Sequence, residues 1–338
     1  MQKTLVTIAV AASLGLGATA AQAATLDDVM AKDYVQCGVT GGVPGFSAPD
    51  ANNVWSGLEV DFCRAVAAAI FDDADKVRYT PLTSQERFAA LSAGEIDILS
   101  RTTTWTMSRD TDLGIKFAGV MYYDGQGFMV RESDGIASAM DLSGAAICIE
   151  SGTTTELNAA DYFETNGLDY SPVVFTDQDE VVKAFEDGRC DVYTTDASAL
   201  AAERSKFANP DDYEILPEII SKEPLGPSVR QGDDQWFSIA RWTYFALLEA
   251  EELGVTQANV DEMLGSDNPA IKRLLGVEGE FGAPLGLSND WAYRIVKHVG
   301  NYGESFDRHV GPDTEIGLER GLNALWTDGG IQYAMPIR

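Results

Sequence analysis

The residues between Thr83 and Arg109 combine hydroxyl and guanidinium groups at a spacing that suits the binding of a carboxylate. Hydroxyl side chains crowd the segment from Ser100 to Thr104, and Arg101 lies among them. A guanidinium binds a carboxylate through two parallel N–H···O bonds, and hydroxyls and exposed amides add further donors. The alternative is a solvated loop that caps a helix, and this stretch alone does not decide between the two.

A helix and a strand precede this loop and must position it. Arg87 opens the predicted helix, and Phe88 and Leu91 give it an apolar face. Gly94 is expected to end the helix as a left-handed cap. Residues 96–99 form a short apolar strand, so that the hydroxyl-rich loop leaves the carboxyl end of a strand. In open α/β sheets, ligands bind at that end.

A second stretch repeats this arrangement. Residues 91–98 and 185–192 each contain a helix end, a glycine and a strand with an aspartate, and a threonine-rich loop follows. The first loop leads to Arg109, whereas the second ends at Asp196. Two such units that face each other would suit a free amino acid, which carries both a carboxylate and an ammonium. Chance similarity is the alternative, because these turn residues recur for local reasons.

Strand and helix patterns alternate along the chain, which predicts an α/β fold with parallel strands. The strands are expected at 34–39, 77–79, 96–99, 122–130, 145–149, 173–175 and 191–193. The helices are expected at 60–70, 87–94, 179–187, 234–253 and 289–302, with one more opening at 151–156.

The first 23 residues have the pattern of a signal peptide. Lys3 precedes an apolar run from Leu5 to Ala21, and a small-residue cleavage motif ends at Ala23. A membrane anchor needs about 20 strongly apolar residues, and this Gly- and Ala-rich run is weaker. We therefore expect export to the periplasm and cleavage after Ala23.

The net charge and the histidine content restrict the function classes. A formal charge of −29 argues against nucleic acid and anionic membranes as partners. The only histidines, His298 and His309, lie near the C-terminus, which argues against histidine-based catalysis or metal binding in the core. No cofactor is expected.

Four cysteines follow the predicted cleavage site: Cys37, Cys63, Cys148 and Cys190. An exported chain meets an oxidising compartment, so two disulfides are expected. Three pairings are open, and proximity within each unit favours Cys37–Cys63 and Cys148–Cys190. Buried free thiols are the alternative.

In combination, these features resemble the family 3 solute-binding proteins of ABC transporters, which bind polar amino acids. The resemblance rests on an ordered series of motifs: residues 37–39, 57–61, Gly94, Asp97, 102–104, Arg109, 151–154 and Asp196. Residues 221–227, Trp236 and the long C-terminal segment resemble a narrower subgroup, the general L-amino-acid and glutamate/glutamine/aspartate/asparagine-binding proteins.

The resemblance implies a two-lobed periplasmic-binding-protein fold of type II, the Venus-flytrap fold, with a mainly parallel mixed sheet flanked by helices in each lobe. Lobe 1 is expected at 24–127, lobe 2 at 128–226, and a return to lobe 1 with a C-terminal extension at 227–338. The lobes would close on a free L-amino acid about crossings near 125–130 and 223–229. We expect a monomer that delivers its ligand to the membrane permease of an ABC transporter.

The same resemblance assigns the groups that hold the α-carboxylate. Arg109 would grip it, with help from Thr104 and from backbone amides at Thr153 or Thr154 at a helix N-terminus. Arg101 is adjacent and would either assist or face solvent.

Other positions would recognise the α-ammonium and the side chain. Asp196 and Thr102 would accept hydrogen bonds from the ammonium. Ser84 and Arg87 match the positions that contact a side-chain carboxylate in glutamate and aspartate binders, and Gln178 would add a contact from lobe 2.

The chain departs from the family pattern at three positions. Leu58 and Val43 stand where members often have aromatic residues, so Phe46 or Trp105 is expected to supply a ring over the ligand. Glu150 replaces a neutral residue of some acidic-ligand binders and would favour an amide or a broader ligand range.

Two other function classes fit the same scaffold. One is a periplasmic enzyme, such as a dehydratase, for which Glu150 is the only attractive general acid or base. The other is the sensor domain of a receptor, which would require fusion to a membrane segment that we do not expect here.

Overall fold

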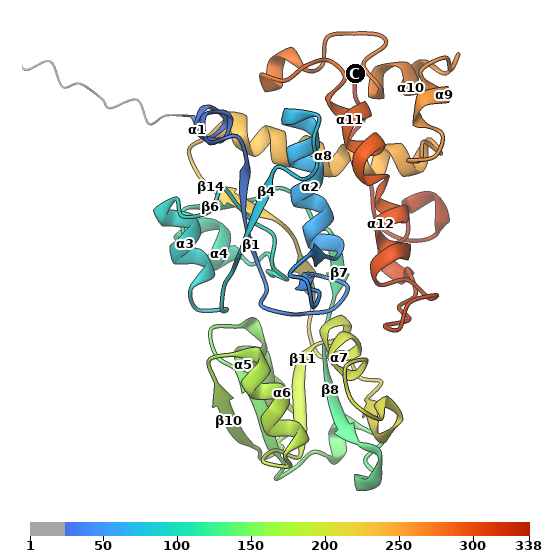
Figure 1. Cartoon of the computed structure of the whole chain (residues 1–338). Coiled ribbons are helices and arrows are strands. Elements are labelled where there is room, and N and C mark those ends of the chain that lie inside the picture. Colours follow the sequence, from blue (N-terminus) through green and yellow to red (C-terminus); the bar gives the residue numbers. More distant parts are fainter. Residues whose placement is uncertain (1–23) are drawn as a thin grey trace, which may run out of the picture.

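The computed structural model describes residues 24–338, and the predicted signal peptide lies outside this range. Figure 1 shows two lobes with a sheet in each, and a group of C-terminal helices beside the lobe that contains α1 (Thr25–Lys32). The predicted two-lobed α/β class is therefore confirmed. No helix between residues 24 and 338 combines the length and apolarity that a membrane crossing requires.

Lobe 1 contains a five-stranded sheet in the order β4-β1-β5-β14-β6. Its strands are β1 (Val35–Val39), β4 (Val77–Pro81), β5 (Ile98–Leu99), β6 (Ile115–Phe117) and β14 (Ser228–Arg230). β1 pairs in parallel with β4 and β5, whereas β14 is antiparallel to β5 and β6. Its inner strands are apolar and buried, as expected of a sheet covered by helices on its faces. The chief covering helices are α2 (Leu58–Phe71), α3 (Arg87–Ala93) and α8 (Asp234–Glu252).

Lobe 2 repeats this design with the order β10-β9-β11-β8-β12. Its strands are β8 (Gln126–Arg131), β9 (Ala146–Glu150), β10 (Ser171–Phe175), β11 (Val192–Asp196) and β12 (Tyr213–Ile215). β9 is parallel to β10 and β11, and β8 is antiparallel to β11 and β12. Three helices pack on this sheet: α5 (Thr154–Asn166), α6 (Gln178–Glu186) and α7 (Ala197–Arg204).

The chain crosses between the lobes on two antiparallel strands, β7 (Tyr122–Asp124) and β13 (Glu223–Leu225). The prediction of one continuous strand over 122–130 was wrong, because the strand breaks at Gly125 into β7 and β8. A Cβ at Gly125 would lie 2.1 Å from Ile219 Cγ2 and 2.8 Å from the carbonyl oxygen of Ser221. The returning chain therefore passes too close for any other residue to fit without movement.

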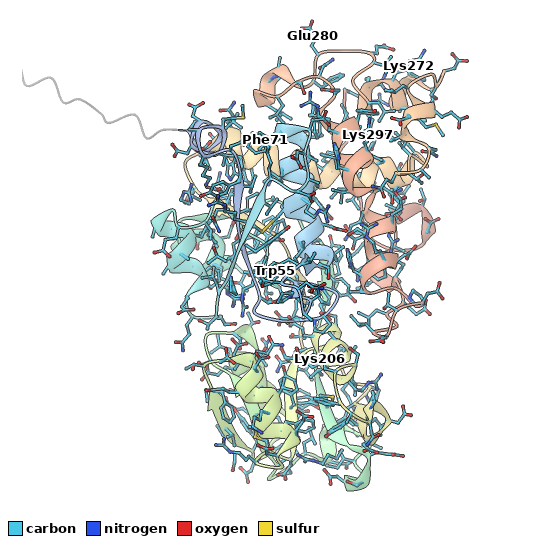
Figure 2. All side chains as sticks on the ribbon, in the orientation of Figure 1. Trp55, Phe71, Lys206, Lys272, Glu280 and Lys297 are labelled. Carbon is cyan, nitrogen blue, oxygen red and sulfur yellow. A yellow bond between two sulfur atoms is a disulfide. The ribbon has the colours of Figure 1, made fainter. Side chains whose placement is uncertain are left out.

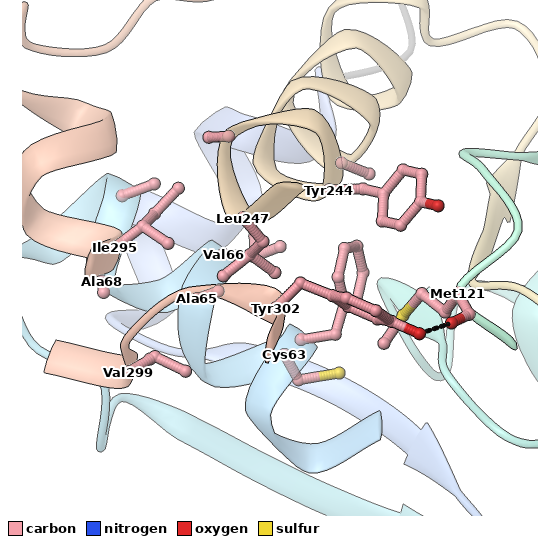
Figure 3. Close-up of a cluster of buried hydrophobic side chains, with 14 of the residues drawn as sticks. Cys63, Ala65, Val66, Ala68, Met121, Tyr244, Leu247, Ile295, Val299 and Tyr302 are labelled. Carbon is pink, nitrogen blue, oxygen red and sulfur yellow. Dashed lines mark hydrogen bonds between the residues drawn. The ribbon is translucent and has the colours of Figure 1, made fainter. Parts of the chain in front are cut away.

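The predicted helix at 289–302 is in fact two helices, α11 (Trp291–Val299) and α12 (Tyr302–His309). Gly300 separates them with a φ of 93°, which L side chains rarely adopt. Asn301 and Glu304 then form a capping box at the start of α12. In Figure 3, side chains of both helices pack with those of α2 and α8, so the C-terminal extension enlarges the core of lobe 1.

Both predicted disulfides are confirmed. Cys37–Cys63 joins β1 to α2. Cys148–Cys190 joins β9 to the chain two residues before β11. They close loops of 26 and 42 residues, and restricting the unfolded chain in this way typically stabilises a fold by about 3–4 kcal/mol per bond.

The remaining strands and α-helices are short. They are β2 (Ala48–Pro49), β3 (Trp55–Ser56), α4 (Met107–Asp112), α9 (Val260–Met263) and α10 (Pro269–Leu274). Of these, α4 bears on the site, because it follows the hydroxyl-rich loop after β5.

Candidate functional site

The polar residues at the boundary between the lobes come from chain segments that follow parallel strands. In lobe 1, the loop after β1 supplies Val43, and the loop after β5 supplies Arg101, Thr102 and Thr104. In lobe 2, β9 ends at Glu150 and the chain after it supplies residues 153–155, while β11 ends at Asp196. The carboxyl ends of parallel strands thus converge from both lobes on one place, as in other α/β binding sites.

These segments surround a cavity that we call the central cavity. Its volume of about 30 Å³ is room for about two water molecules and less than an amino acid needs, so the lobes must separate to admit one. The lining residues are Val43, Ser84, Arg87, Arg101, Thr102, Thr104, Glu150, Thr153, Thr154, Thr155, Gln178, Thr195, Asp196 and Ala199. Every predicted ligand residue is in this set except Arg109, Phe46 and Trp105.

Arg109 lies beside the central cavity rather than on its wall. Its Nη1 donates to the carbonyl oxygen of Thr104 at 2.9 Å, and its guanidinium lies 5.2 Å from the ring of Phe88. Burial lowers the pKa of Arg109, while the nearby carboxylates of Glu223 and Asp196 act in the opposite direction. A buried arginine with one backbone acceptor retains donors for a ligand carboxylate.

The two aromatic residues expected over the ligand pack elsewhere. Phe46 is 1% exposed and lies edge-on to Tyr122 at 5.5 Å. Trp105 stacks on Phe117 at 5.4 Å. Both rings serve the core of lobe 1, because each finds an apolar neighbour there. The cavity wall carries the small side chains of Val43 and Ala199 instead.

Ser84 and Arg87 present buried polar atoms to the central cavity. Their exposed fractions are only 1% and 2%, and neither Ser84 Oγ nor Arg87 Nε has a partner among residues 24–338. The two Nη atoms of Arg87 make long contacts of 3.4 Å to Thr103 Oγ1 and to the carbonyl oxygen of Gly152. Unpaired buried polar groups are costly, so this corner of the cavity is suited to a polar ligand group.

Arg101 and Glu150 form an ion pair across the lobes. Arg101 Nη2 lies 3.7 Å from Glu150 Oε1, and its Nε donates to the carbonyl oxygen of Leu82 at 2.9 Å. The backbone N–H of Ser84 donates to the same Glu150 oxygen at 3.4 Å. Arg101 therefore meets a counter-charge in the protein, and Glu150 links lobe 2 to two elements of lobe 1.

Asp196 ends β11 and faces the arginines of lobe 1 across the cavity. Burial, followed by the carboxylates of Asp124 and Glu223, raises the pKa of Asp196 well above its usual range, and Arg87 and Arg109 act against this rise. An ammonium group beside Asp196 would stabilise its charged form. The part of the chain that the structure describes contains no cluster of histidine, cysteine and acidic side chains suited to a metal ion.

The first turn of α5 adds anion-binding character from lobe 2. Thr153 is the cap residue and donates its hydroxyl proton to the carbonyl oxygen of Glu150 at 2.7 Å. Thr154 and Thr155 follow as the first helical residues and line the cavity. Backbone N–H groups in a first helical turn have no intrahelical acceptor, so they favour a carboxylate.

Glu223 is a buried residue of the site that sequence reasoning missed. It lies on the crossing strand β13 and is 2% exposed. Its carboxylate accepts hydrogen bonds from the hydroxyls of Thr104 and Thr154 at 2.6 and 2.9 Å. An acidic residue before the apolar Pro224-Leu225 was the available signal, but its partners lie up to 119 positions away.

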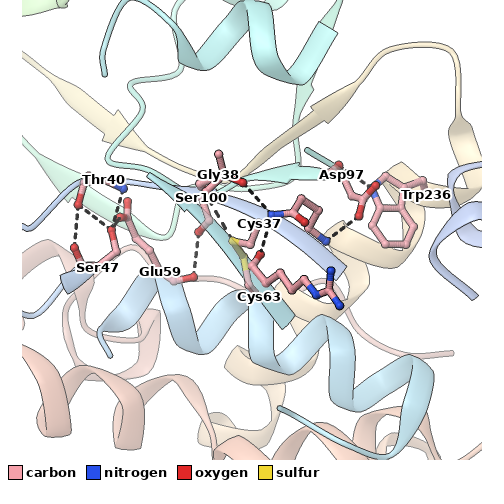
Figure 4. The surroundings of a disulfide bond; sticks show 12 residues. Cys37, Gly38, Thr40, Ser47, Glu59, Cys63, Asp97, Ser100 and Trp236 are labelled. Carbon is pink, nitrogen blue, oxygen red and sulfur yellow. Dashed lines mark hydrogen bonds between the residues drawn. A yellow bond between two sulfur atoms is a disulfide. The ribbon is translucent and has the colours of Figure 1, made fainter. Parts of the chain in front are cut away.

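Glu59 is a second residue that was missed. Burial raises the pKa of Glu59 to about 7, against the lowering effect of hydrogen bonds from the Thr102 backbone N–H and the Ser47 hydroxyl. Figure 4 shows Glu59 and Ser47 near the disulfide Cys37–Cys63. Thr102 has a φ of 29°, which a β-branched residue rarely adopts, and Glu59 anchors its backbone in that conformation.

Further contacts hold the lobes together at the rim of the cavity. Gln85 Nε2 donates to Ser151 Oγ at 2.8 Å. Lys206, at the edge of lobe 2 in Figure 2, donates to the carbonyl oxygen of Gly42 at 3.3 Å. Gln178 donates to Glu203 within lobe 2 at 3.0 Å, which orients its amide at the cavity wall. The structure is therefore that of a closed pair of lobes.

Known proteins share this fold and much of this sequence. The model of the bacterial extracellular solute-binding proteins, family 3, matches residues 35–253. The general L-amino acid-binding periplasmic protein AapJ of Rhizobium johnstonii is 62% identical over 97% of both chains. The glutamate/glutamine/aspartate/asparagine-binding protein BztA of Rhodobacter capsulatus is 54% identical over 96% of both.

A solved structure is similar over nearly the whole described chain. It is an ABC transporter periplasmic binding protein from Brucella ovis with glutathione bound, and it is 57% identical with a TM-score of 0.92. The match covers 94% of this chain and 100% of that one.

Proposed function

Since the chain belongs to the family 3 bacterial extracellular solute-binding proteins, we propose that it captures polar or acidic L-amino acids between its lobes. Glutamate, glutamine, aspartate and asparagine are the first candidates, because the relative BztA is named for them. The loaded protein then delivers its ligand to the permease of an ABC transporter. The proposed site of action is the periplasm, after cleavage of the signal peptide behind Ala23.

One observation carries this proposal: lobe 1 presents guanidinium groups to the boundary, and lobe 2 presents Asp196 across the same cavity. A free amino acid matches this distribution, because its carboxylate and ammonium carry opposite charges. We assign the carboxylate to Arg109, the backbone N–H of Thr104 and the first turn of α5, and the ammonium to Asp196, Thr102 and the hydroxyl oxygen of Thr104. Binding on both lobes stabilises the closed state, which is how a ligand shifts such an equilibrium.

The side chain of the ligand is assigned to the corner that holds Ser84 and Arg87. The unpaired Ser84 Oγ and Arg87 Nε support this assignment, because a ligand carboxylate or amide would satisfy both. Gln178 would contact the same group from lobe 2. The ion pair of Arg101 with Glu150 leaves less of the Arg101 charge for the ligand, which suits amides as well as acids.

A second cavity extends the ligand range that we propose. This side cavity of about 190 Å³ shares Arg101, Glu150 and Gln178 with the central cavity. The Brucella ovis relative binds glutathione, a ligand longer than glutamate. The side cavity would accept the distal part of a long ligand with a neutral or cationic end, because the carboxylates of Glu86 and Asp179 line it; the anionic glycine end of glutathione does not suit this lining.

An enzyme on this scaffold is the alternative, and the surroundings of Glu150 favour binding over catalysis. A general acid or base must exchange a proton with the substrate. Glu150 is instead engaged by Arg101 and by the Ser84 backbone. These contacts fix it as a link between the lobes.

A binding screen of the chain from Ala24 onward tests the proposal. Tryptophan fluorescence would be recorded with each common L-amino acid, followed by calorimetry on those that change the signal. We expect saturable binding of at least one of the four candidates, with recovery of unchanged ligand by mass spectrometry. Absence of binding to every amino acid, or conversion of one, would contradict the proposal.

A further inference from the structure

We propose that Glu223 is a positioning residue that turns Thr104 and Thr154 into hydrogen-bond acceptors and so selects ligands with an α-ammonium group. This inference rests on the proposed function, and it adds a specificity device on the crossing strand. It is carried by the geometry of a single buried carboxylate and by the direction of its hydrogen bonds.

The carboxylate of Glu223 is fully occupied by donors. Oε2 accepts from Thr104 Oγ1 at 2.6 Å and from Thr154 Oγ1 at 2.9 Å. Oε1 accepts from Asn158 Nδ2 at 2.6 Å and from Ser221 Oγ at 2.7 Å. With four donors and 2% exposure, the side chain is held in one orientation.

The direction of these bonds follows from the chemistry of the groups. An ionised carboxylate has no proton to give, and each threonine hydroxyl has one. The protons of Thr104 and Thr154 are therefore directed to Glu223, and their oxygens turn lone pairs toward other donors. Because both residues line the central cavity, these lone pairs suit a group that only donates. An ammonium has three donors and no acceptor, whereas a keto oxygen only accepts.

The same contacts connect recognition to closure. Thr104 belongs to lobe 1, Thr154 and Asn158 belong to lobe 2, and Glu223 lies on the strand between them. All four hydrogen bonds can exist together only when the lobes are closed. Glu223 thereby completes the acceptor set in the state that retains the ligand.

The surrounding charges agree with this role. Glu223 and Asp124 are among the causes that raise the pKa of Asp196, after burial. Asp124 lies directly opposite Glu223 in the antiparallel pairing of the two crossing strands. The carboxylates of Asp196, Glu223 and Asp124 repel one another when the lobes close. A ligand with a keto group in place of the ammonium does not offset this repulsion. A ligand ammonium offsets their repulsion.

The experiment compares L-glutamate with 2-oxoglutarate, which differs in having a keto group in place of the ammonium. Calorimetry would measure both ligands with the full mature chain and with Glu223→Gln, which keeps the size but adds an amide donor. We expect the wild-type preference for L-glutamate to fall at least tenfold in the variant, because the threonine hydroxyls become free to donate. Glu223→Asp should restore part of the preference, since it keeps the carboxylate.

Two further variants keep the test informative. Thr104→Val removes one acceptor and should also lower the preference for L-glutamate at least tenfold. It carries the test if Glu223→Gln does not fold. Asp97→Asn is the control, because it removes a buried carboxylate that is paired with Lys32 and precedes β5, at the opposite end of that strand from the cavity residues. It should leave the preference unchanged.

The outcomes separate this inference from the proposed function. If the wild-type chain binds L-glutamate and the preference is the same in Glu223→Gln and Thr104→Val, the role of Glu223 is overturned and the proposed function stands. If the wild-type chain binds no amino acid, the proposed function is overturned, and the inference that rests on it is overturned too.

Discussion

At the scale of single residues, Ser84 and Arg87 are the two members of the central cavity that keep a buried polar atom without a partner among residues 24–338. Arg101 and Glu150, by contrast, are paired with each other. We infer that the residues of the site have two separate roles. One set of groups recognises any α-amino acid, and the corner of Ser84 and Arg87 recognises the side chain.

The first prediction concerns Arg87. Arg87→Ala should weaken binding of L-glutamate about 10- to 100-fold, because a hydrogen bond to a charged group contributes about 1.5–3 kcal/mol. Binding of small neutral amino acids should change less than about fivefold, since they do not reach this corner. Calorimetry with L-glutamate and L-serine measures both effects. Arg64→Ala, on the opposite end of lobe 1, is the control. An equal loss for both ligands would assign Arg87 a structural role.

The second prediction concerns pH and stability. Burial raises the pKa of Glu59 from 4.5 to about 7 in the folded protein, and burial also raises the pKa of Glu203 to about 7. Between pH 4.5 and about 7, the two glutamates hold more protons in the folded state than in the unfolded state. The stability that these protons provide is therefore lost as the pH rises through this range.

Chemical unfolding at several pH values tests this second prediction. The free energy of unfolding should fall by an amount of the order of 1–3 kcal/mol per group across this window. Glu59→Gln should reduce the slope, because glutamine does not titrate. A free energy that rises with pH, or an unchanged slope in Glu59→Gln, would show that Glu59 does not titrate in this range.

The family resemblance predicted roles for individual residues of the site, but the set of residues was incomplete. The hydroxyl-rich loop and Asp196 were identified because their motifs are local. Glu223 and Glu59 were missed because their hydrogen-bond partners come from segments far apart in the chain. Phe46 or Trp105 was assigned to the ligand because Leu58 and Val43 stand where family members often have aromatic residues, and the sequence does not reveal which way a ring points.

At the scale of elements, two glycines decide where the predicted elements break. Gly125 divides β7 from β8, and Gly300 divides α11 from α12. The periodicity of the flanking residues continues through both glycines, so the sequence alone predicts one strand and one helix. The break at Gly125 has a tertiary cause, because the chain near Ile219 and Ser221 passes against it.

The third prediction follows from this close approach. Gly125→Ala should lower the free energy of unfolding by about 1–3 kcal/mol through overpacking and should also weaken ligand binding, because the crossing strands must move. Gly127→Ala is a matched control two residues away, where a Cβ would lie 3.4 Å from Leu200 Cδ1. It should be nearly neutral. Thermal unfolding and calorimetry of both variants measure the difference, and equal behaviour would remove the special role of Gly125.

At the scale of the whole molecule, the duplicated unit was the strongest guide. The two stretches around residues 91–98 and 185–192 predicted two lobes with opposed charges, and the structure contains two sheets of similar strand order. The pairing of cysteines also followed from this division. The closed arrangement was not predictable, because it depends on contacts between lobes that are distant in sequence, such as Gln85 with Ser151.

The C-terminal extension belongs to the same scale. The sequence offered no role for it, whereas the structure packs α11 and α12 against α2 and α8 (Figure 3). Tyr302 Oη donates to the carbonyl oxygen of Met121, just before the crossing strand β7, at 2.7 Å. The extension therefore braces the lobe from which one of the two crossings starts.

The central claim is that an amino acid binds as a zwitterion between the lobes, and Asp196 is its most direct test. Calorimetry would titrate L-glutamate and L-glutamine into the mature chain, into Asp196→Asn and into the exposed control Asp161→Asn. We predict that Asp196→Asn weakens both ligands about 30-fold or more, by analogy with the 2–5 kcal/mol cost of removing one partner of a buried charge pair, and that the control binds normally. Wild-type affinity of Asp196→Asn for both ligands would contradict the account.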